Sequence, residues 1–218
     1  YGIALTGGDT VSTPGPLSVT VCALGSVPAG RALTRSGARP GDLVFVTGTI
    51  GDAALGLAVL KGELSVLPPE RQAALIDRYR RPQPRIGLGV RLVGMAHAAI
   101  DVSDGLVADL AHVCKESGVL AVIEAAWIPL SAGVQTAVDA DGRCLERVLT
   151  GGDDYEILFT APPDGRDAIV GLSADMGLRI TEIGRIESAI GAGKENPVTV
   201  RDAAGKPMRI AATGFRHF

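Results

Sequence analysis

The pattern of apolar and polar positions predicts a series of short strands separated by turns. Runs of four to nine residues rich in β-branched and apolar side chains, bounded by Gly, Pro and Asp, are typical of strands. The sequence "LVFVTG" is one such run. We predict strands at 16–24, 43–48, 120–130, 155–162, 178–187 and 197–202, and a further one in the apolar residues that lead into Asp101.

Segments with helical apolar spacing lie between these runs. We predict helices at 49–62, with Gly62 as the stop, and at 68–82, 84–96, 103–117, 142–152 and 164–177. The glycine pair that ends 142–152 suits a helix C-terminus, and Pro69 suits the first turn of 68–82. Because strands and helices alternate along the chain, we predict the α/β fold class, a layered α+β sandwich.

A turn-rich stretch, "GSVPAGRALTRSGARPGD" at 25–42, separates the first predicted strand from the rest. Such a change in composition is typical of a domain boundary, which we place near residues 36–42. The chain begins "YGIALTGGDT", without an initiator Met or a signal-peptide pattern. We therefore expect it to be the later part of a longer protein.

Charge and composition exclude several classes of protein. The 218 residues carry a formal charge of −3 and a pI near 5.6, which gives no basic field for nucleic acid. The most apolar stretch, 43–60, is interrupted before the roughly 20 residues of a membrane span. Three widely spaced cysteines favour reduced thiols and a cytoplasmic location. We expect neither a nucleic-acid nor a membrane partner.

Two acids three residues apart mark the start of the helix predicted at 103–117. Asp101 and Asp104 stand in "DVSDG", with Ser103 between them. A single Asp before a helix is ordinarily an N-cap, and Asp101 or Ser103 could serve as one. Two carboxylates that converge on one side of a turn repel each other, and a divalent cation relieves this repulsion. Since Mg²⁺ commonly takes one or two carboxylates plus water and phosphate, we predict a metal and phosphate site, with helix N–H groups as further donors.

Other catalytic patterns are absent from the sequence. It contains no Walker-type phosphate loop and no dinucleotide-binding glycine motif after a strand. The histidines, His97, His112 and His217, are scattered and lie in no local Ser or Cys motif. We therefore assign no general acid or base. Asp52 fits either an acid at a phosphate-facing helix start or an N-cap, and we leave it out of the site. The basic run at 80–85 is interpreted as a solvated helix end, with a phosphate contact as the open alternative, and Trp127 is interpreted as a core residue.

Six ordered motifs resemble the thiamine-monophosphate kinase family of the aminoimidazole-ribonucleotide-synthetase-like ATP-binding superfamily. They are "TGGDT", "GPLSVTV", "GRALTRSGARPGDLVFVTGTIGDAALGL", "DVSDGLVADL", "GGDDYEILFT" and "GFRHF". The resemblance implies that residues 1–38 end an N-terminal ATP-binding domain whose front part is absent here, and that 39–218 form the C-terminal α/β domain. It also implies a cytoplasmic protein that is a homodimer when full length.

The reaction implied by this resemblance transfers the γ-phosphoryl group of ATP to thiamine monophosphate, giving thiamine diphosphate and ADP, with Mg²⁺. The acceptor is a phosphate oxygen that is already ionised at neutral pH. Catalysis then reduces to positioning and charge neutralisation, which agrees with the absence of a histidine-centred apparatus.

The family's functional positions map onto seven residues of this sequence. They are Asp9, Asp101 and Asp104 for the metal, Arg35 and Ser103 for ATP, and Asp153 and Phe215 for the substrate. The family often has Glu where Asp153 stands, and an acid where Arg216 stands, so no role is carried over for Arg216.

Two alternatives remain open from the sequence. One is a related ATP-dependent synthetase or maturation protein of the same superfamily with another acceptor. The other is a catalytically inactive fragment that only binds ligand.

Overall fold

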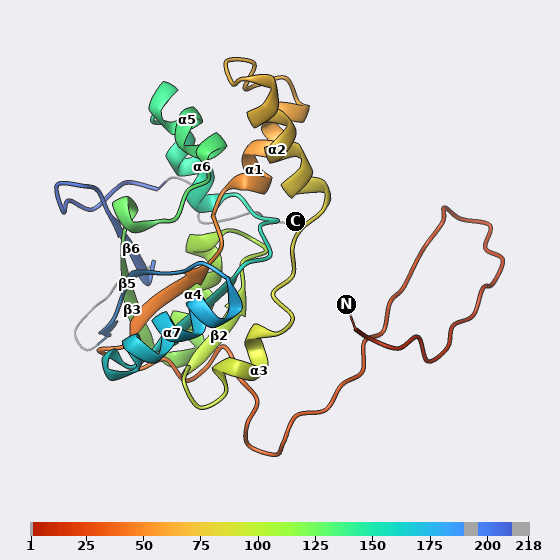
Figure 1. Cartoon of the computed structure of the whole chain (residues 1–218), viewed down its shortest axis with the longest axis horizontal. Coiled ribbons are helices and arrows are strands. Elements are labelled where there is room, and N and C mark those ends of the chain that lie inside the picture. Colours follow the sequence, from red (N-terminus) through yellow and green to blue (C-terminus); the bar gives the residue numbers. More distant parts are fainter. Residues whose placement is uncertain (1, 190–195, 211–218) are drawn as a thin grey trace. The chain divides into compact units, whose positions relative to one another are not determined.

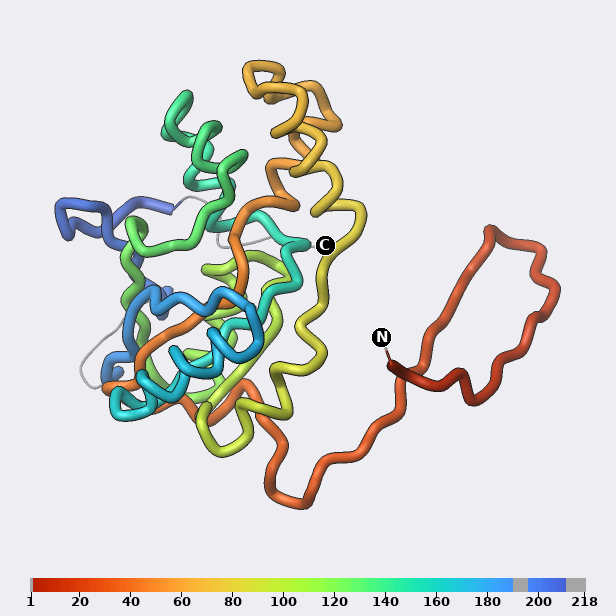
Figure 2. The backbone as a smooth tube through the Cα atoms, in the orientation of Figure 1, coloured from red at the N-terminus to blue at the C-terminus, as the bar shows by residue number. Residues whose placement is uncertain are grey.

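The computed structural model describes residues 2–189 and 196–210, and the chain divides into two compact units, Tyr1–Ala32 and Leu33–Phe218. In the first unit the described residues 2–32 form no helix or strand, as the tube in Figure 2 shows. The strand predicted at 16–24 is therefore wrong. Its alternating Leu17, Val19 and Val21 are 91%, 78% and 86% exposed, because no strand among the described residues pairs with this segment. The domain division at residue 38 stays a prediction.

The second unit is built on a six-stranded sheet in the order β2-β4-β1-β5-β3-β6. The strands are β1 (Leu43–Thr47), β2 (Ala98–Asp101), β3 (Val119–Glu124), β4 (Ile157–Ala161), β5 (Ile180–Ser188) and β6 (Val198–Arg201). Every neighbouring pair is antiparallel except β3 and β6. The strands predicted within this unit are confirmed, although each differs somewhat from its predicted bounds.

Helices cover both faces of this sheet (Figure 1). They are α1 (Asp52–Leu60), α2 (Pro69–Arg80), α3 (Leu88–Leu92), α4 (Leu106–Ser117), α5 (Ala132–Ala140), α6 (Cys144–Thr150) and α7 (Arg166–Met176), with 3₁₀ turns η1 (Ala125–Trp127) and η2 (Pro163–Gly165). On β1, Val44 and Val46 join the core that contains α4, whereas Phe45 joins the core formed with α3 and α7. Successive side chains of β1 thus point to opposite faces of the sheet and join two different cores. The predicted α/β layered sandwich is confirmed.

Two local predictions are wrong, and one helix was not predicted. The helix predicted at 84–96 is only one short turn, α3, since Pro84 and the glycines around it interrupt the segment. Helix α5 was not predicted, although Ser131 stands directly before it and its hydroxyl accepts the N–H of Val134 at 3.2 Å. Trp127 lies in η1 and is 51% exposed, so it is not a core residue.

Candidate active site

Two motifs that are far apart in the sequence, 101–105 and 151–156, run side by side. The N–H of Val102 donates to the carbonyl of Glu156 at 2.8 Å, and the N–H of Tyr155 donates back to Val102 at 2.8 Å. The N–H of Asp153 donates to the carbonyl of Ser103 at 2.9 Å. These bonds continue the pairing of β2 with β4 past the end of β2 and before the beginning of β4. They place Ser103 beside Asp153.

The glycine pair of "GGDDYE" allows this close approach. A Cβ atom on Gly152 would lie 2.0 Å from the carbonyl oxygen of Ser103, and one on Gly151 would lie 2.3 Å from Cβ of Ala54. Neither position has room for a side chain. Gly151 also follows the last residue of α6, so the predicted helix end is confirmed and the pair has a second role in packing the two motifs.

The turn 103–105 is held by an acid inside the helix that follows it. Oδ2 of Asp109 accepts the N–H groups of Ser103, Asp104 and Gly105 at 2.9, 3.0 and 3.2 Å. Burial raises the pKa of Asp109 to about 6. The first residue before α4 is Gly105, which makes no side-chain cap, so the prediction of a cap by Asp101 or Ser103 is wrong. These three N–H groups are engaged by Asp109 and are not free to hold phosphate.

Residues 153–156 alternate between an outward and a buried position. Asp154 and Glu156 are buried, whereas Asp153 is half-buried and Tyr155 is exposed. Asp153 and Tyr155 have φ values of 70° and 50°, a conformation that is uncommon away from glycine and often found at functional sites. Partial burial and the nearby carboxylates, Asp153 first among them, raise the pKa of the Tyr155 hydroxyl.

The buried carboxylate of Asp154 binds backbone N–H groups inside the fold. Its Oδ2 accepts the N–H of Gly51 at 2.7 Å and its Oδ1 accepts the N–H of Ala53 at 3.2 Å. These donors lie at the beginning of α1, so Asp154 caps this helix from a distant part of the chain. Burial raises its pKa to about 7. The N-cap role expected of Asp52 is thus taken by Asp154, because Asp52 is itself the first residue of α1.

The paired motifs form one wall of a cavity of about 670 Å³. This volume is in the range of sites for small-molecule ligands. The cavity is also lined by apolar residues of α1, including Ala54 and Leu57, and by the aromatic residue Tyr79 of α2. Lys61 and Arg147 line the cavity as well, and Nη1 of Arg147 donates to Oε2 of Glu63, another lining residue, at 2.6 Å. The cavity therefore combines an apolar wall with carboxylates and cations.

Three of the predicted site residues, Ser103, Asp104 and Asp153, line this cavity together. Asp101 ends β2, and its charge contributes to the raised pKa of Tyr155, which also lines the cavity. The structure thus gathers two segments that lie about fifty residues apart in the sequence.

The other predicted residues are not gathered here. Arg35 does not line the cavity, and its carbonyl accepts the hydroxyl of Ser117 at the end of α4, at 3.2 Å. Asp9 lies in the first unit, where its Oδ1 accepts the N–H of Thr10 at 2.8 Å. Phe215 and His217 lie outside the described residues.

Sequence reasoning missed three residues of this region: Asp109, Asp154 and Tyr155. The alternation of polar and aromatic residues in "DDYE" carried a signal for Tyr155, since it places that ring on the same side as Asp153. Nothing in the sequence indicated that Asp109 or Asp154 accepts backbone N–H groups, because their donors lie on separate turns of the fold.

The oxygen atoms of Asp101, Ser103 and Asp104 are the kind of ligand that Mg²⁺ prefers, and two carboxylates are as many as it commonly takes from a protein. Within 2–189 and 196–210 no group of three or more His, Cys, Asp or Glu is close enough to hold a metal ion. The donor types of Asp101, Ser103 and Asp104 suit an ion whose remaining ligands are water and phosphate. In the same part of the chain, no helix has the length and apolar character to cross a membrane.

Comparison with known proteins places these motifs in a family. Residues 39–192 match the family model described as AIR synthase related protein, C-terminal domain. The thiamine-monophosphate kinase of Salmonella typhimurium is 45% identical over 218 residues, which are all of this chain and 64% of that protein. The chain thus spans less than two thirds of the length of this relative.

Solved structures agree with this match. The crystal structure of thiamine-monophosphate kinase from Stenotrophomonas maltophilia K279a superposes with a TM-score of 0.72 at 39% identity, over 84% of this chain and 56% of that one. The structure of AaThiL complexed with AMPPCP and TMP gives 0.67 at 37%, over 85% and 54%. The resemblance to thiamine-monophosphate kinases is confirmed, and the chain belongs to the AIR synthase related family, whose C-terminal domain it carries.

Proposed function

We propose that this protein phosphorylates thiamine monophosphate with ATP and Mg²⁺, giving thiamine diphosphate. The observation that carries the proposal is the convergence of Ser103, Asp104 and Asp153 on one cavity of about 670 Å³. The structure of AaThiL, which is 37% identical to this chain, is a complex with AMPPCP and TMP, and this supports the same pair of ligands here.

Each predicted residue receives a role in this proposal. Asp101 and Asp104 are metal ligands, Asp9 is carried over from the resemblance as a further metal ligand, and Ser103 and Arg35 contact ATP. Asp153 contacts the substrate, and Phe215 stacks on its thiamine ring system. Bound Mg²⁺ supplies neutralisation of charge on the transferring phosphoryl group.

The chemistry needs no general base from the described residues. An oxygen of the substrate phosphate forms a bond to the γ-phosphorus of ATP, and the bond from that phosphorus to the β,γ-bridging oxygen breaks to release ADP. The attacking oxygen already carries negative charge. His97 is paired with Asp42 at 2.9 Å, and neither His97 nor His112 lines the cavity.

The domain and assembly predictions belong to the same proposal. Residues 1–38 end an N-terminal ATP-binding domain, 39–218 form the C-terminal α/β domain, and the full-length protein is a cytoplasmic homodimer. Light scattering on the protein with any residues that flank this chain tests the dimer. A monomer at micromolar concentration contradicts it.

The direct test of the reaction is Mg²⁺-dependent formation of thiamine diphosphate by Asp101→Asn and Asp104→Asn, in the protein with any flanking residues. We expect each to lose on the order of a hundredfold or more in turnover, because preorganised charge dominates phosphoryl transfer. The matched control is Asp175→Asn, which changes an exposed acid paired with Arg91 and should retain activity. Near-normal turnover in both site variants contradicts the proposal.

Two further assays separate the alternatives. A panel of acceptors, with thiamine monophosphate beside amidine-type and selenide-type acceptors, distinguishes the kinase from a related synthetase or maturation protein. Binding of thiamine monophosphate without ATP consumption by these 218 residues alone supports a form that binds ligand without transfer. This second possibility has support in the 64% coverage of the relative.

A further inference from the structure

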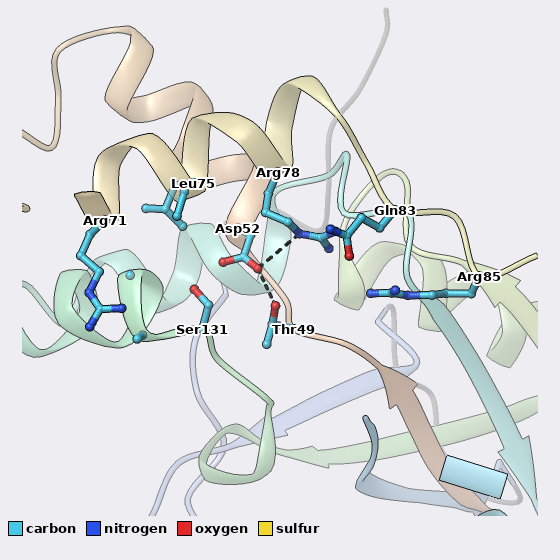
Figure 3. Close-up of a pocket in the computed structure, with 11 residues that line it drawn as sticks. Thr49, Asp52, Arg71, Leu75, Arg78, Gln83, Arg85 and Ser131 are labelled. Carbon is cyan, nitrogen blue, oxygen red and sulfur yellow. Dashed lines mark hydrogen bonds and ion pairs between the residues drawn. The ribbon is translucent and has the colours of Figure 1, made fainter. Parts of the chain in front are cut away.

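The buried acids differ in what their carboxylates bind. Asp52 lines a second cavity of about 280 Å³ beside the beginning of α1, which α2 and the start of α5 also line (Figure 3). Its Oδ2 lies 3.7 Å from Nε of Arg78. Buried Glu156 accepts hydrogen bonds from Nη2 of Arg78 at 2.9 Å and from Nε of Arg85 at 2.7 Å. These two acids thus pair with arginines, and the interpretation of 80–85 as a solvated helix end is wrong at Arg85.

The carboxylate of Asp109 binds backbone N–H groups instead. Its Oδ2 accepts the successive N–H groups of residues 103, 104 and 105, and within the described part of the chain it has no ion pair with an arginine, lysine or histidine. Successive N–H groups that converge in this way form a concave binding site for an anion. The chain itself supplies the anion here. Because Asp109 is only 2% exposed, solvent has little access to these bonds.

The main chain of Asp109 contacts the same turn. Its N–H donates to the carbonyl of Gly105 at 2.9 Å, while its Oδ2 accepts the N–H of Gly105 at 3.2 Å. Gly105 has a φ of 119°, and a Cβ atom at this position would lie 2.6 Å from the carbonyl oxygen of Thr150. The turn is therefore packed against the last residue of α6 on one side and bonded to α4 through Asp109.

Two of the donors to Asp109 belong to residues that the proposed function assigns to Mg²⁺ and ATP. Ser103 and Asp104 provide these N–H groups, and both residues line the larger cavity. The position of a side chain follows that of its own backbone, so the bonds to Asp109 limit where the Ser103 hydroxyl and the Asp104 carboxylate can lie. Replacement of a residue that orients a metal ligand commonly weakens metal affinity about ten- to a hundredfold.

We propose that Asp109 is a positioning residue, whose carboxylate fixes the turn 103–105 so that the side chains of Ser103 and Asp104 meet Mg²⁺ and the nucleotide in the larger cavity. Asp109 acts through these two residues and not on a ligand itself. The inference rests on the proposed function, because that function assigns Asp104 to Mg²⁺ and Ser103 to ATP.

The test measures binding of the ATP analogue AMPPCP by isothermal titration at several Mg²⁺ concentrations, with protein that carries any residues that flank this chain. We expect Asp109→Ala to raise the Mg²⁺ concentration for half-maximal AMPPCP binding about tenfold. Asp109→Asn keeps an acceptor oxygen without the charge, so its value should lie between those of the wild type and Asp109→Ala. Wild-type values in both variants overturn the proposal. If Asp109→Ala does not fold, a wild-type value in Asp109→Asn alone overturns it.

Asp202→Ala is the matched control. Oδ1 of Asp202 accepts the N–H groups of Ala204 and Lys206 at 2.9 and 2.8 Å, so this acid also holds a turn, but it lines neither cavity. The variant should keep the wild-type Mg²⁺ dependence, and an equal change in Asp202→Ala and Asp109→Ala overturns the positioning role. Failure of the wild type to bind AMPPCP with Mg²⁺ contradicts the proposed function and the inference with it, whereas wild-type values in the Asp109 variants overturn the inference alone.

Discussion

The two cavities beside α1 differ in what the segment 153–156 gives each of them. Asp153 and Tyr155 line the larger cavity, whereas Glu156 is buried and neutralises arginines of the smaller one. Asp154 lies between these roles and caps α1. Neighbouring residues of one motif therefore have different roles. The outward Asp153 and Tyr155 are available to ligands, whereas the buried Asp154 and Glu156 stabilise the fold.

We expect the largest effect, a loss of stability, from a change of the buried Glu156. Glu156→Gln leaves Arg78 and Arg85 without their shared carboxylate, and breaking a buried ion pair costs about 3–5 kcal/mol in the free energy of unfolding. Denaturant unfolding measures this loss. The control Glu187→Gln removes an exposed partner of Arg185 and should cost less than about 1 kcal/mol. Similar values for the two variants would show that Glu156 is not the support we describe.

The contribution of Asp154 to the free energy of unfolding depends on pH. Its pKa is raised by burial from 3.8 to about 7, so its contribution to stability is fully present below pH 4 and is lost as the pH rises through 7. We expect the free energy of unfolding of the wild type to fall by about 4 kcal/mol, relative to Asp154→Asn, between pH 4 and pH 8. Denaturant unfolding of both proteins at several pH values measures this difference in the free energy of unfolding. A difference that does not change with pH contradicts the raised pKa of Asp154.

Gly152→Ala tests the contact between the two motifs. The added methyl group would overlap the carbonyl oxygen of Ser103, so the backbone must shift, at a cost of about 1–3 kcal/mol. We also expect weaker binding of thiamine monophosphate, because Asp153 moves with the shift. Gly171→Ala, on the open side of α7, is the control and should stabilise the protein by up to about 1 kcal/mol. A Gly152→Ala protein as stable as the control would rule out close packing here.

Much of the architecture could be predicted from local pattern. The apolar run at 43–48 and the glycines after α6 and α7 predicted a strand and helix ends that the structure confirms. The segment 16–24, which alternates apolar and polar residues, also has a strand-like pattern and forms no strand, because pairing depends on a partner strand that local pattern does not reveal.

The candidate site could be predicted only in part. Ser103, Asp104 and Asp153 were identified from their motifs, and the structure brings them to one cavity. The contacts of Asp109 with the turn, and of Glu156 with Arg85, join residues whose proximity depends on tertiary packing. Burial and partner identity decide the role of each acid, and neither can be derived from spacing along the chain.

The most direct test of the proposed function is the dissociation constant of thiamine monophosphate, measured by isothermal titration with wild type and Asp153→Asn. Our account predicts binding about tenfold weaker in the variant, because it loses a charge at the cavity wall. Asp164→Asn, which alters an exposed acid in η2, should bind as the wild type does. Unchanged affinity in Asp153→Asn would contradict the claim that this cavity holds the substrate.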